Sequence, residues 1–103
     1  MLLREDKSQK PDFTYLGMVY EASARIAQRF MFGEQKYARG NWREAKEVQT
    51  YKESATRHLF QYLSGQTDED HLCAAAVNLI ILMDLEEQKK KEKTNETTRA
   101  RKQ

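Results

Sequence analysis

The sequence is poor in several features that define common protein classes. It has one cysteine, Cys73, which excludes an internal disulfide framework and a cysteine-rich zinc site. No apolar run is long enough to span a bilayer, because Asn78 and Asp84 interrupt the longest one, residues 72–85. Charged residues begin at Arg4, so no signal peptide is indicated. We therefore expect a soluble cytoplasmic protein without a membrane partner, and the initial methionine leads us to expect a complete chain.

The chain also lacks an excess of one charge and the common catalytic motifs. Its 18 basic and 16 acidic residues give a formal net charge of +2, so nucleic acid is not an expected partner. There is no HExxH, Walker A, dinucleotide-binding glycine or GxSxG motif, which leaves nucleophilic catalysis without a candidate. At 103 residues it is one domain with a modest core, a size often helped by oligomerisation.

Apolar residues recur at helical spacing and no strand-like alternation is present, so we expect an all-α fold, a small bundle of three main helices. The first helix should begin near Asp12 or Thr14, either of which can cap its first turn, and end at Gly33. The second should run from about 44 to 63, with the acidic side chains of Glu44 and Glu47 at the positive end of its dipole. Its apolar stripe comprises Tyr51, Ala55, His58, Leu59 and Tyr62.

The third helix is expected from about 70 to at least 87, and Thr67 or Asp68 can cap it. The linker before it is short and acidic, so the second and third helices should be antiparallel neighbours. Its first part is apolar on nearly every side, which favours a homo-oligomer formed through helix 70–87. The expected organisation is a flexible arm over residues 1–11, a helical domain over 12–87 and a charged, frayed or disordered tail over 88–103.

The segment 32–43 is the most informative part of the chain. Its only tryptophan, Trp42, and Tyr37 can stack on a base, and Asn41 can read a base edge. Three cations suit phosphate: Lys36, Arg39 and Arg43. The alternative is a turn between helices in which the tryptophan covers the edge of the core.

Two histidines and an asparagine lie on apolar helix faces. His58 is either a hydrogen-bonded core residue or a catalyst, and Arg57 beside it points to another side of the same helix. His71 and Asn78 are two helical turns apart on one face. Because an unpaired buried amide costs about 1–3 kcal/mol, Asn78 needs partners, either a ligand or another helix.

Acidic residues offer candidate ligands for Mg²⁺, which needs one or two carboxylates. The candidates are Glu21, Glu34, Glu53, Asp68, Glu69 and Asp70. The last three stand at a helix start, where capping is the alternative explanation.

Together these residues form a serial pattern: Phe32-Gly33-x-x-Lys36-Tyr37-x-x-Gly40-Asn41-Trp42-Arg43, Arg57-His58-Leu59, Tyr62-x-x-Gly65, Asp68 and His71-Leu72-x-x-Ala75-x-x-Asn78-Leu79. Over residues 15–86 the chain resembles a small phage and bacterial family named for dATP/dGTP diphosphohydrolase, related to the MazG-like all-α nucleotide pyrophosphohydrolases. It departs from that pattern at Ala74, where many members place a second histidine, and it lacks a clean MazG-type acidic signature.

The resemblance implies a helical bundle, commonly a dimer or tetramer, in the cytoplasm of a bacterium or a phage-infected host. It implies hydrolysis of a purine deoxynucleoside triphosphate to monophosphate and pyrophosphate, with Mg²⁺ or Mn²⁺ as the cofactor. In phages this reaction fits the remodelling of host nucleotide pools.

The expected roles follow from the resemblance and from side-chain chemistry. Catalytic groups would be Lys36 and Arg57 on the phosphates, with His58 or His71 positioning water or a phosphate oxygen. Substrate-binding residues would be Tyr37, Asn41, Trp42, Arg43 and Asn78. Metal ligands would be Glu34, Glu53, Asp68 and Asp70.

Two other functions remain open on the sequence. The incomplete acidic signature favours a protein that binds a nucleotide or cyclic nucleotide without hydrolysing it, acting as a sponge. The apolar third helix and basic tail are also typical of a helical interaction module, whose affinity for a polyanion would fall steeply with salt.

Overall fold

The computed structural model describes residues 9–45 and 47–102, and all regular structure in these ranges is helical. The elements are α1 (Thr14–Met18), α2 (Tyr20–Glu34), the 3-10 helix η1 (Asn41–Glu44), α3 (Gln49–Leu63) and α4 (His71–Lys102). The expected all-α fold is confirmed, with α2, α3 and α4 as its main helices. The first eight residues of the expected N-terminal arm lie outside the described residues.

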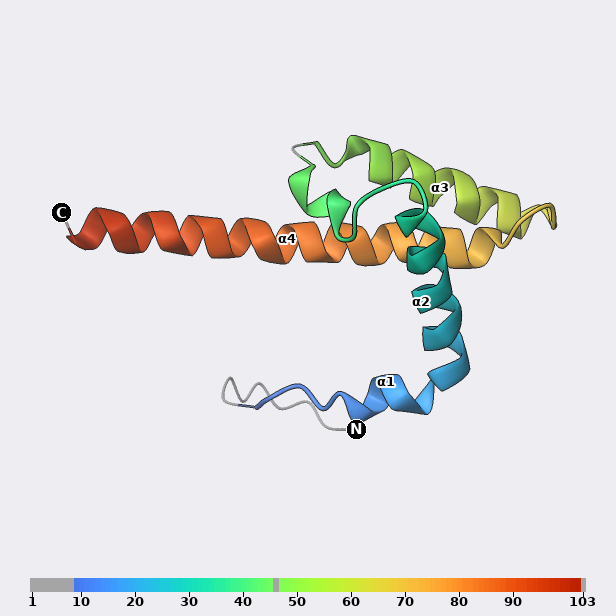
Figure 1. Ribbon diagram of the computed structural model, residues 1–103, viewed down its shortest axis with the longest axis horizontal. Helices are drawn as coiled ribbons and strands as arrows, with labels where there is room; N and C mark the ends of the chain where they lie inside the picture. The colour runs from blue at the N-terminus through green and yellow to red at the C-terminus, as the bar shows by residue number, and fades with distance from the viewer. Residues whose placement is uncertain (1–8, 46, 103) are drawn as a thin grey trace.

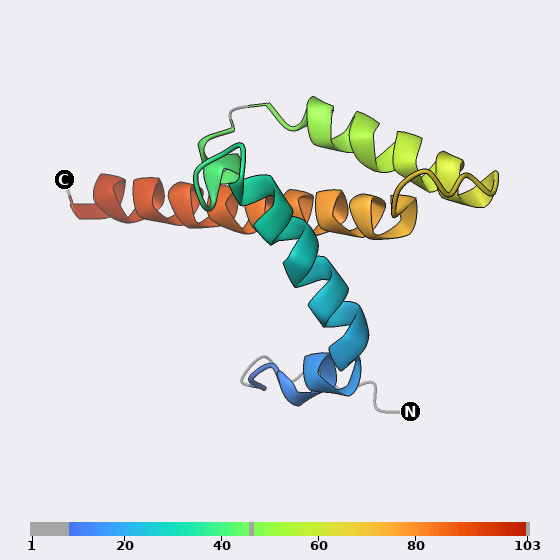
Figure 2. The same ribbon diagram turned by 45° about the vertical axis from the view of Figure 1, so that its right-hand side comes forward.

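Helices α3 and α4 lie side by side and antiparallel, as the short linker predicts, and α2 crosses α4 (Figures 1 and 2). Gly65 makes the sharp reversal after α3 possible, because its φ of 85° is a left-handed conformation that glycine adopts without strain. The following backbone N–H, of Gln66, donates to the Gln61 carbonyl at 3.1 Å, and that of Gly65 donates to Tyr62 at 3.0 Å. These two bonds form a Schellman motif that satisfies the last carbonyls of α3.

The core lies along one side of α4, where buried residues repeat every four positions. They are Cys73, Val77, Ile81 and Leu85, and the partly buried residues packed against them include Ile26, Phe30, Trp42, Val48 and Tyr51. The small residues Ala55 on α3 and Ala74 and Ala75 on α4 are buried, and so are His58 on α3 and His71 on α4. The core therefore receives side chains from α2, η1 and α3, and it places the segment after α2 against the middle of α4.

Several expected helix boundaries are wrong. The first helix is broken at Val19, whose φ and ψ of −111° and 47° are not helical, and α2 ends at Glu34 rather than at Gly33. The second helix begins at Gln49, so Glu44 belongs to η1 and neither it nor Glu47 stands in the first turn of α3. Residues 41–44 form η1 instead, and Trp42 there contacts α4, as described below.

The start and the end of the third helix also differ from expectation. Asp70, rather than Thr67 or Asp68, caps α4, since its Oδ1 accepts the backbone N–H of Cys73 at 3.1 Å. Helix α4 continues to Lys102, so residues 88–102 extend the same helix, and the expected charged, frayed or disordered tail stays a prediction. Ion pairs within a helix, such as Lys90 with Glu87 at 2.9 Å, favour this continuation.

The molecule is elongated, and much apolar surface stays exposed. Its radius of gyration is 17.1 Å, whereas a globular chain of this length has about 13 Å. Exposed side chains gather on α1 and α2, including Met18 at 78% and Tyr20 at 74%, and on α4 they include Leu79 and Met83. The expected homo-oligomer through helix 70–87 stays a prediction. Among the described residues, no helix combines the length and the apolar character needed to cross a membrane.

Candidate functional site

An open pocket of about 1140 Å³ lies between the end of α2, the segment that follows it, the start of α3 and the middle of α4. Six of the residues predicted from the sequence line it: Glu34, Lys36, Tyr37, Arg39, Asn41 and Trp42. Gly40 turns the chain at the pocket edge with a φ of 73°, which brings η1 back toward α4. The segment 32–43 is thus both a turn between helices and the wall of a pocket, so its two interpretations are compatible.

Trp42 and Arg43 are held by a carboxylate on α4. The indole Nε1–H of Trp42 donates to Asp84 Oδ2 at 2.8 Å, and its ring lies 5.1 Å from that of Phe30. Arg43 donates to both oxygens of the same Asp84, at 2.9 and 3.2 Å. The charge of Arg43 is therefore already paired with Asp84. Trp42 packs against the core and also lines the pocket. Asp84 was missed as a site residue, although a carboxylate in an apolar helix was its signal.

This carboxylate should make the fold acid-sensitive. The hydrogen bonds from Arg43 and Trp42 hold the pKa of Asp84 below its usual value. Since a depressed carboxylate pKa stabilises the fold above the unfolded pKa of about 4, that contribution should be lost as pH falls through the lower folded value. We expect wild type to be more stable than Asp84→Asn at pH 7 and the difference to shrink below about pH 4. Urea unfolding of both proteins at several pH values measures this, and a constant difference would contradict it.

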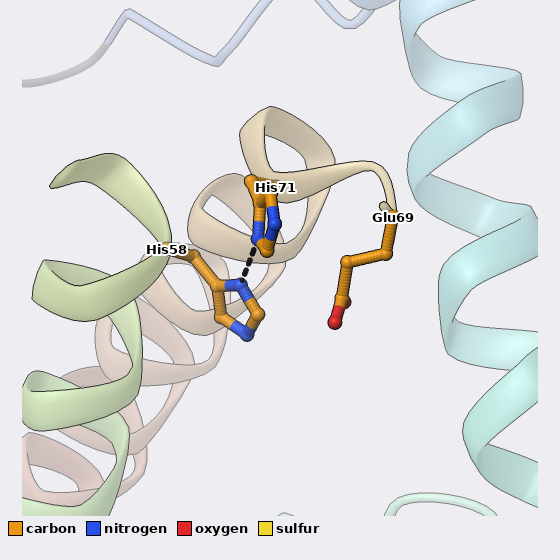
Figure 3. Close-up of side chains that lie close together, drawn as sticks. All are labelled: His58, Glu69 and His71. Atoms are coloured by element: carbon orange, nitrogen blue, oxygen red, sulfur yellow. Dashed lines mark hydrogen bonds between the residues drawn. The ribbon is translucent and has the colours of Figure 1, made fainter. Parts of the chain in front are cut away.

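The two histidines meet in a buried cluster outside the pocket (Figure 3). His58 on α3 and His71 on α4 have their Nδ1 atoms 2.9 Å apart, and their side chains are almost fully buried. The other ring nitrogen of His71, Nε2, lies 2.7 Å from Asp68 Oδ1. Glu69, from the linker, points toward the same pair. The sequence placed each histidine on an apolar face but did not predict that they touch.

Protonation within the cluster follows from its contacts. Burial lowers the pKa of His58, which keeps this imidazole neutral near pH 7. The hydrogen bond with His71 lowers the pKa of Asp68, which is thus a carboxylate that accepts the Nε2 proton. One ring of the pair must donate its Nδ1–H and the other accept it at 2.9 Å, and the tautomers of the two rings decide which does.

The four predicted metal ligands are not gathered into one group. Glu34 is at the pocket, 3.8 Å from Arg39 Nε, and Glu53 is exposed on α3, where Gln49 donates to it. Asp68 is engaged by His71, and Asp70 forms an ion pair of 2.7 Å with Arg25 besides capping α4. The group of metal-capable side chains that the described residues do form is His58, Glu69 and His71.

Two further predicted residues do not line the pocket. Asn78 finds its partners within the protein, because its Nδ2 donates to the Ala74 carbonyl at 2.8 Å and to Ser54 Oγ at 3.2 Å. This amide therefore links α4 to α3. Arg57 is exposed on α3 and is not among the residues that line the pocket.

Arg29 connects the pocket with the histidine cluster and was not singled out from the sequence. Its side chain lines the pocket, and its Nη2 donates to Glu69 Oε1 at 3.0 Å. The position on α2, one turn before Phe32 and Gly33, was a weak signal, because any exposed helix carries such cations. Only its contact with Glu69 and its place in the pocket wall identify Arg29 as a candidate site residue.

The chain was also compared with known proteins. A family model described as dATP/dGTP diphosphohydrolase, N-terminal, matches residues 3–95. No curated protein and no solved structure was found to match.

Proposed function

The chain belongs to the dATP/dGTP diphosphohydrolase N-terminal family, and on this premise we propose that it hydrolyses purine (deoxy)nucleoside triphosphates in the pocket beside α2. The products would be the monophosphate and pyrophosphate. The single observation that carries the proposal is the pocket itself, whose wall combines cations, an aromatic ring and an amide. Its volume of about 1140 Å³ is slightly above the usual range of about 300–1,000 Å³ for small-molecule sites, so a nucleoside triphosphate has room in it.

Phosphate binding falls to the cations of the wall. Lys36 and Arg39 are exposed at the pocket, whereas Arg29, which also lines it, is paired with Glu69. Lys36 would offset the negative charge that builds up on the phosphates as the bond to the leaving pyrophosphate breaks. Arg57 and Arg43 are less suited to this role, because Arg57 does not line the pocket and Arg43 is paired with Asp84.

Recognition of the base would use Tyr37 and Asn41. Tyr37 is 59% exposed at the pocket, so its ring is free to stack on a purine. Asn41 is exposed on the same wall and offers both a donor and an acceptor to a base edge. Trp42 would support this wall from behind, since Asp84 and Phe30 hold its ring.

Mg²⁺, or Mn²⁺ in its place, fits the carboxylates of the pocket. Glu34 and Glu47 both line it, and Mg²⁺ in such sites takes one or two carboxylates together with substrate phosphates. When bound, the ion would supply charge for the phosphates and a polarised water. A homo-oligomer in the cytoplasm of a bacterial or phage-infected cell, where it would remodel the nucleotide pool, completes the proposal and rests on the resemblance.

Product analysis tests the proposal directly. The pure chain is incubated with each dNTP and NTP, with Mg²⁺ and with EDTA, and the products are separated by anion exchange. We expect monophosphate and pyrophosphate from a purine triphosphate, and no product with EDTA. Release of inorganic phosphate and a diphosphate, or no turnover of any triphosphate, would contradict the assignment.

A second candidate function is nucleotide binding without hydrolysis. The specific observation that favours it is the scattering of the four predicted carboxylate ligands over the pocket, α3 and the start of α4. In this case a nucleotide or cyclic nucleotide would raise the melting temperature equally with and without Mg²⁺, and no product would form. The same incubations, followed by a thermal-shift screen, separate the two functions.

A further inference from the structure

The cluster of His58, Glu69 and His71 has the composition of a metal site. Each residue offers one ligand atom, and these atoms lie within 4.8 Å of one another. They come from α3, the linker and the start of α4, so the fold and not the local sequence brings them together (Figure 3). We propose that this cluster binds a divalent transition-metal ion, Zn²⁺ being the best match, separately from the Mg²⁺ of the pocket.

Asp68 prepares His71 for this role. Its carboxylate accepts the Nε2 proton at 2.7 Å, which fixes the ring; in the neutral form that a metal ligand needs, the lone pair of Nδ1 is then directed at the cluster. A carboxylate behind a histidine is the usual outer partner of a metal-binding imidazole, because it sets the tautomer and raises the basicity of the ligand. A histidine buried only for packing needs one partner for each nitrogen, and His71 has these in His58 and Asp68. Neither ring needs the carboxylate of Glu69 as a hydrogen-bond partner, and Glu69 is held nearby by Arg29.

The spacing of the two imidazoles suits a shared ion after a small movement. Their Nδ1 atoms are 2.9 Å apart. Two nitrogens bound to zinc at about 2.0–2.1 Å in tetrahedral geometry stand about 3.3 Å apart. If the two Nδ1 atoms move apart by a few tenths of an ångström, a metal ion bound to both of them can replace the hydrogen bond. His58 would then carry its proton on Nε2, and both rings remain neutral, as metal binding requires.

Glu69 supplies the third ligand and remains accessible. Its side chain is 42% exposed, and its Oε1 accepts a hydrogen bond from Arg29 at 3.0 Å. The carboxylate has a second oxygen for a metal, and hydrogen-bonded carboxylates are common among metal ligands. Two histidines and one glutamate leave a fourth position open, which is the composition of catalytic rather than structural zinc sites.

The ligand set also selects the metal. Imidazole nitrogens suit Zn²⁺ and other late transition-metal ions, whereas Mg²⁺ prefers oxygen ligands. We therefore expect the histidine cluster not to bind Mg²⁺. This makes the inference independent of the proposed hydrolysis, since binding can be measured without any nucleotide.

Isothermal titration calorimetry of the full chain, freed of metal with a chelator, tests the site. Wild type should bind one Zn²⁺ per chain, and millimolar Mg²⁺ should not displace it. His58→Gln and His71→Gln should each weaken binding at least tenfold, and Glu69→Gln should weaken it as well. Glu86→Gln is the matched control, because this glutamate is exposed on α4 outside the cluster. It should bind like wild type.

The substitution at Glu69 keeps the test decisive if a histidine variant fails to fold, because Glu69 is exposed and its change leaves the buried pair intact. Circular dichroism of each variant reports folding. No Zn²⁺ binding by folded wild type, or equal affinity of wild type and Glu69→Gln, would overturn the proposal. Displacement of Zn²⁺ by Mg²⁺ would do so too, since it would place the ion on carboxylates alone.

Discussion

Replacing Lys36 by methionine should lower kcat for the hydrolysed triphosphate by about 100-fold, because removing one preorganised charge from a developing phosphate costs this much or more. Lys36 lies in the wall of the pocket on the segment after α2. Methionine keeps most of the length and apolar bulk of the side chain but removes the charge. Steady-state kinetics with separate kcat and KM values measure the effect. A rise of KM alone would indicate that Lys36 only holds the ground-state substrate.

Lys52→Met is the matched control for this variant. Lys52 is an exposed lysine on α3 that does not line the pocket, so the same loss of charge occurs outside the site. Its kcat should stay within about twofold of wild type, since surface changes away from a site rarely alter turnover. Equal losses in the two variants would mean that net charge matters and not the position of Lys36.

Replacing Trp42 by alanine should lower the free energy of unfolding by about 3 kcal/mol, near the lower end for removal of a packed aromatic side chain. Its ring contacts Phe30 and the core along α4, and its Nε1–H donates to Asp84. The substitution removes apolar contacts and the hydrogen bond together. Urea unfolding followed by far-UV circular dichroism measures it, since Trp42 is the only tryptophan and fluorescence is lost with it.

Trp42→Phe separates the two contributions. Phenylalanine keeps an aromatic ring against Phe30 but cannot donate to Asp84, which retains the two hydrogen bonds from Arg43. We expect a loss of about 1 kcal/mol, the usual net value of one hydrogen bond. If alanine costs no more than phenylalanine, the ring does not anchor the pocket wall, and Trp42 becomes the better candidate for stacking on a base.

Local spacing explains which parts of the fold could be predicted. Apolar residues spaced three and four positions apart predicted α2, α3 and the first half of α4. Gly65 predicted the end of α3. The boundaries that failed depend on distant contacts. Helix α3 begins at Gln49, and before it Trp42 and Arg43 are hydrogen-bonded to Asp84, 42 and 41 positions further along the chain. No local pattern contains that pairing.

The candidate site divides in the same way. Lys36, Tyr37 and Asn41 could be predicted because they are neighbours in sequence and share one wall in space. The histidine cluster could not, since His58 and His71 lie 13 positions apart on antiparallel helices. Helical periodicity gave each of them an apolar face, but only the register of α3 on α4 decides which faces meet.

The sequence by itself determined the helical class, the antiparallel pairing of the last two helices and the polar segment that became the pocket wall, because these follow from nearby residues. The tertiary structure alone decided three further features. It committed Asp84 to Trp42 and Arg43, turned Asn78 into a link between helices, and placed Glu69 beside two buried histidines. The physical reason is that each of these polar groups needs a partner when the helices pack, and the packing geometry determines which partner is within reach.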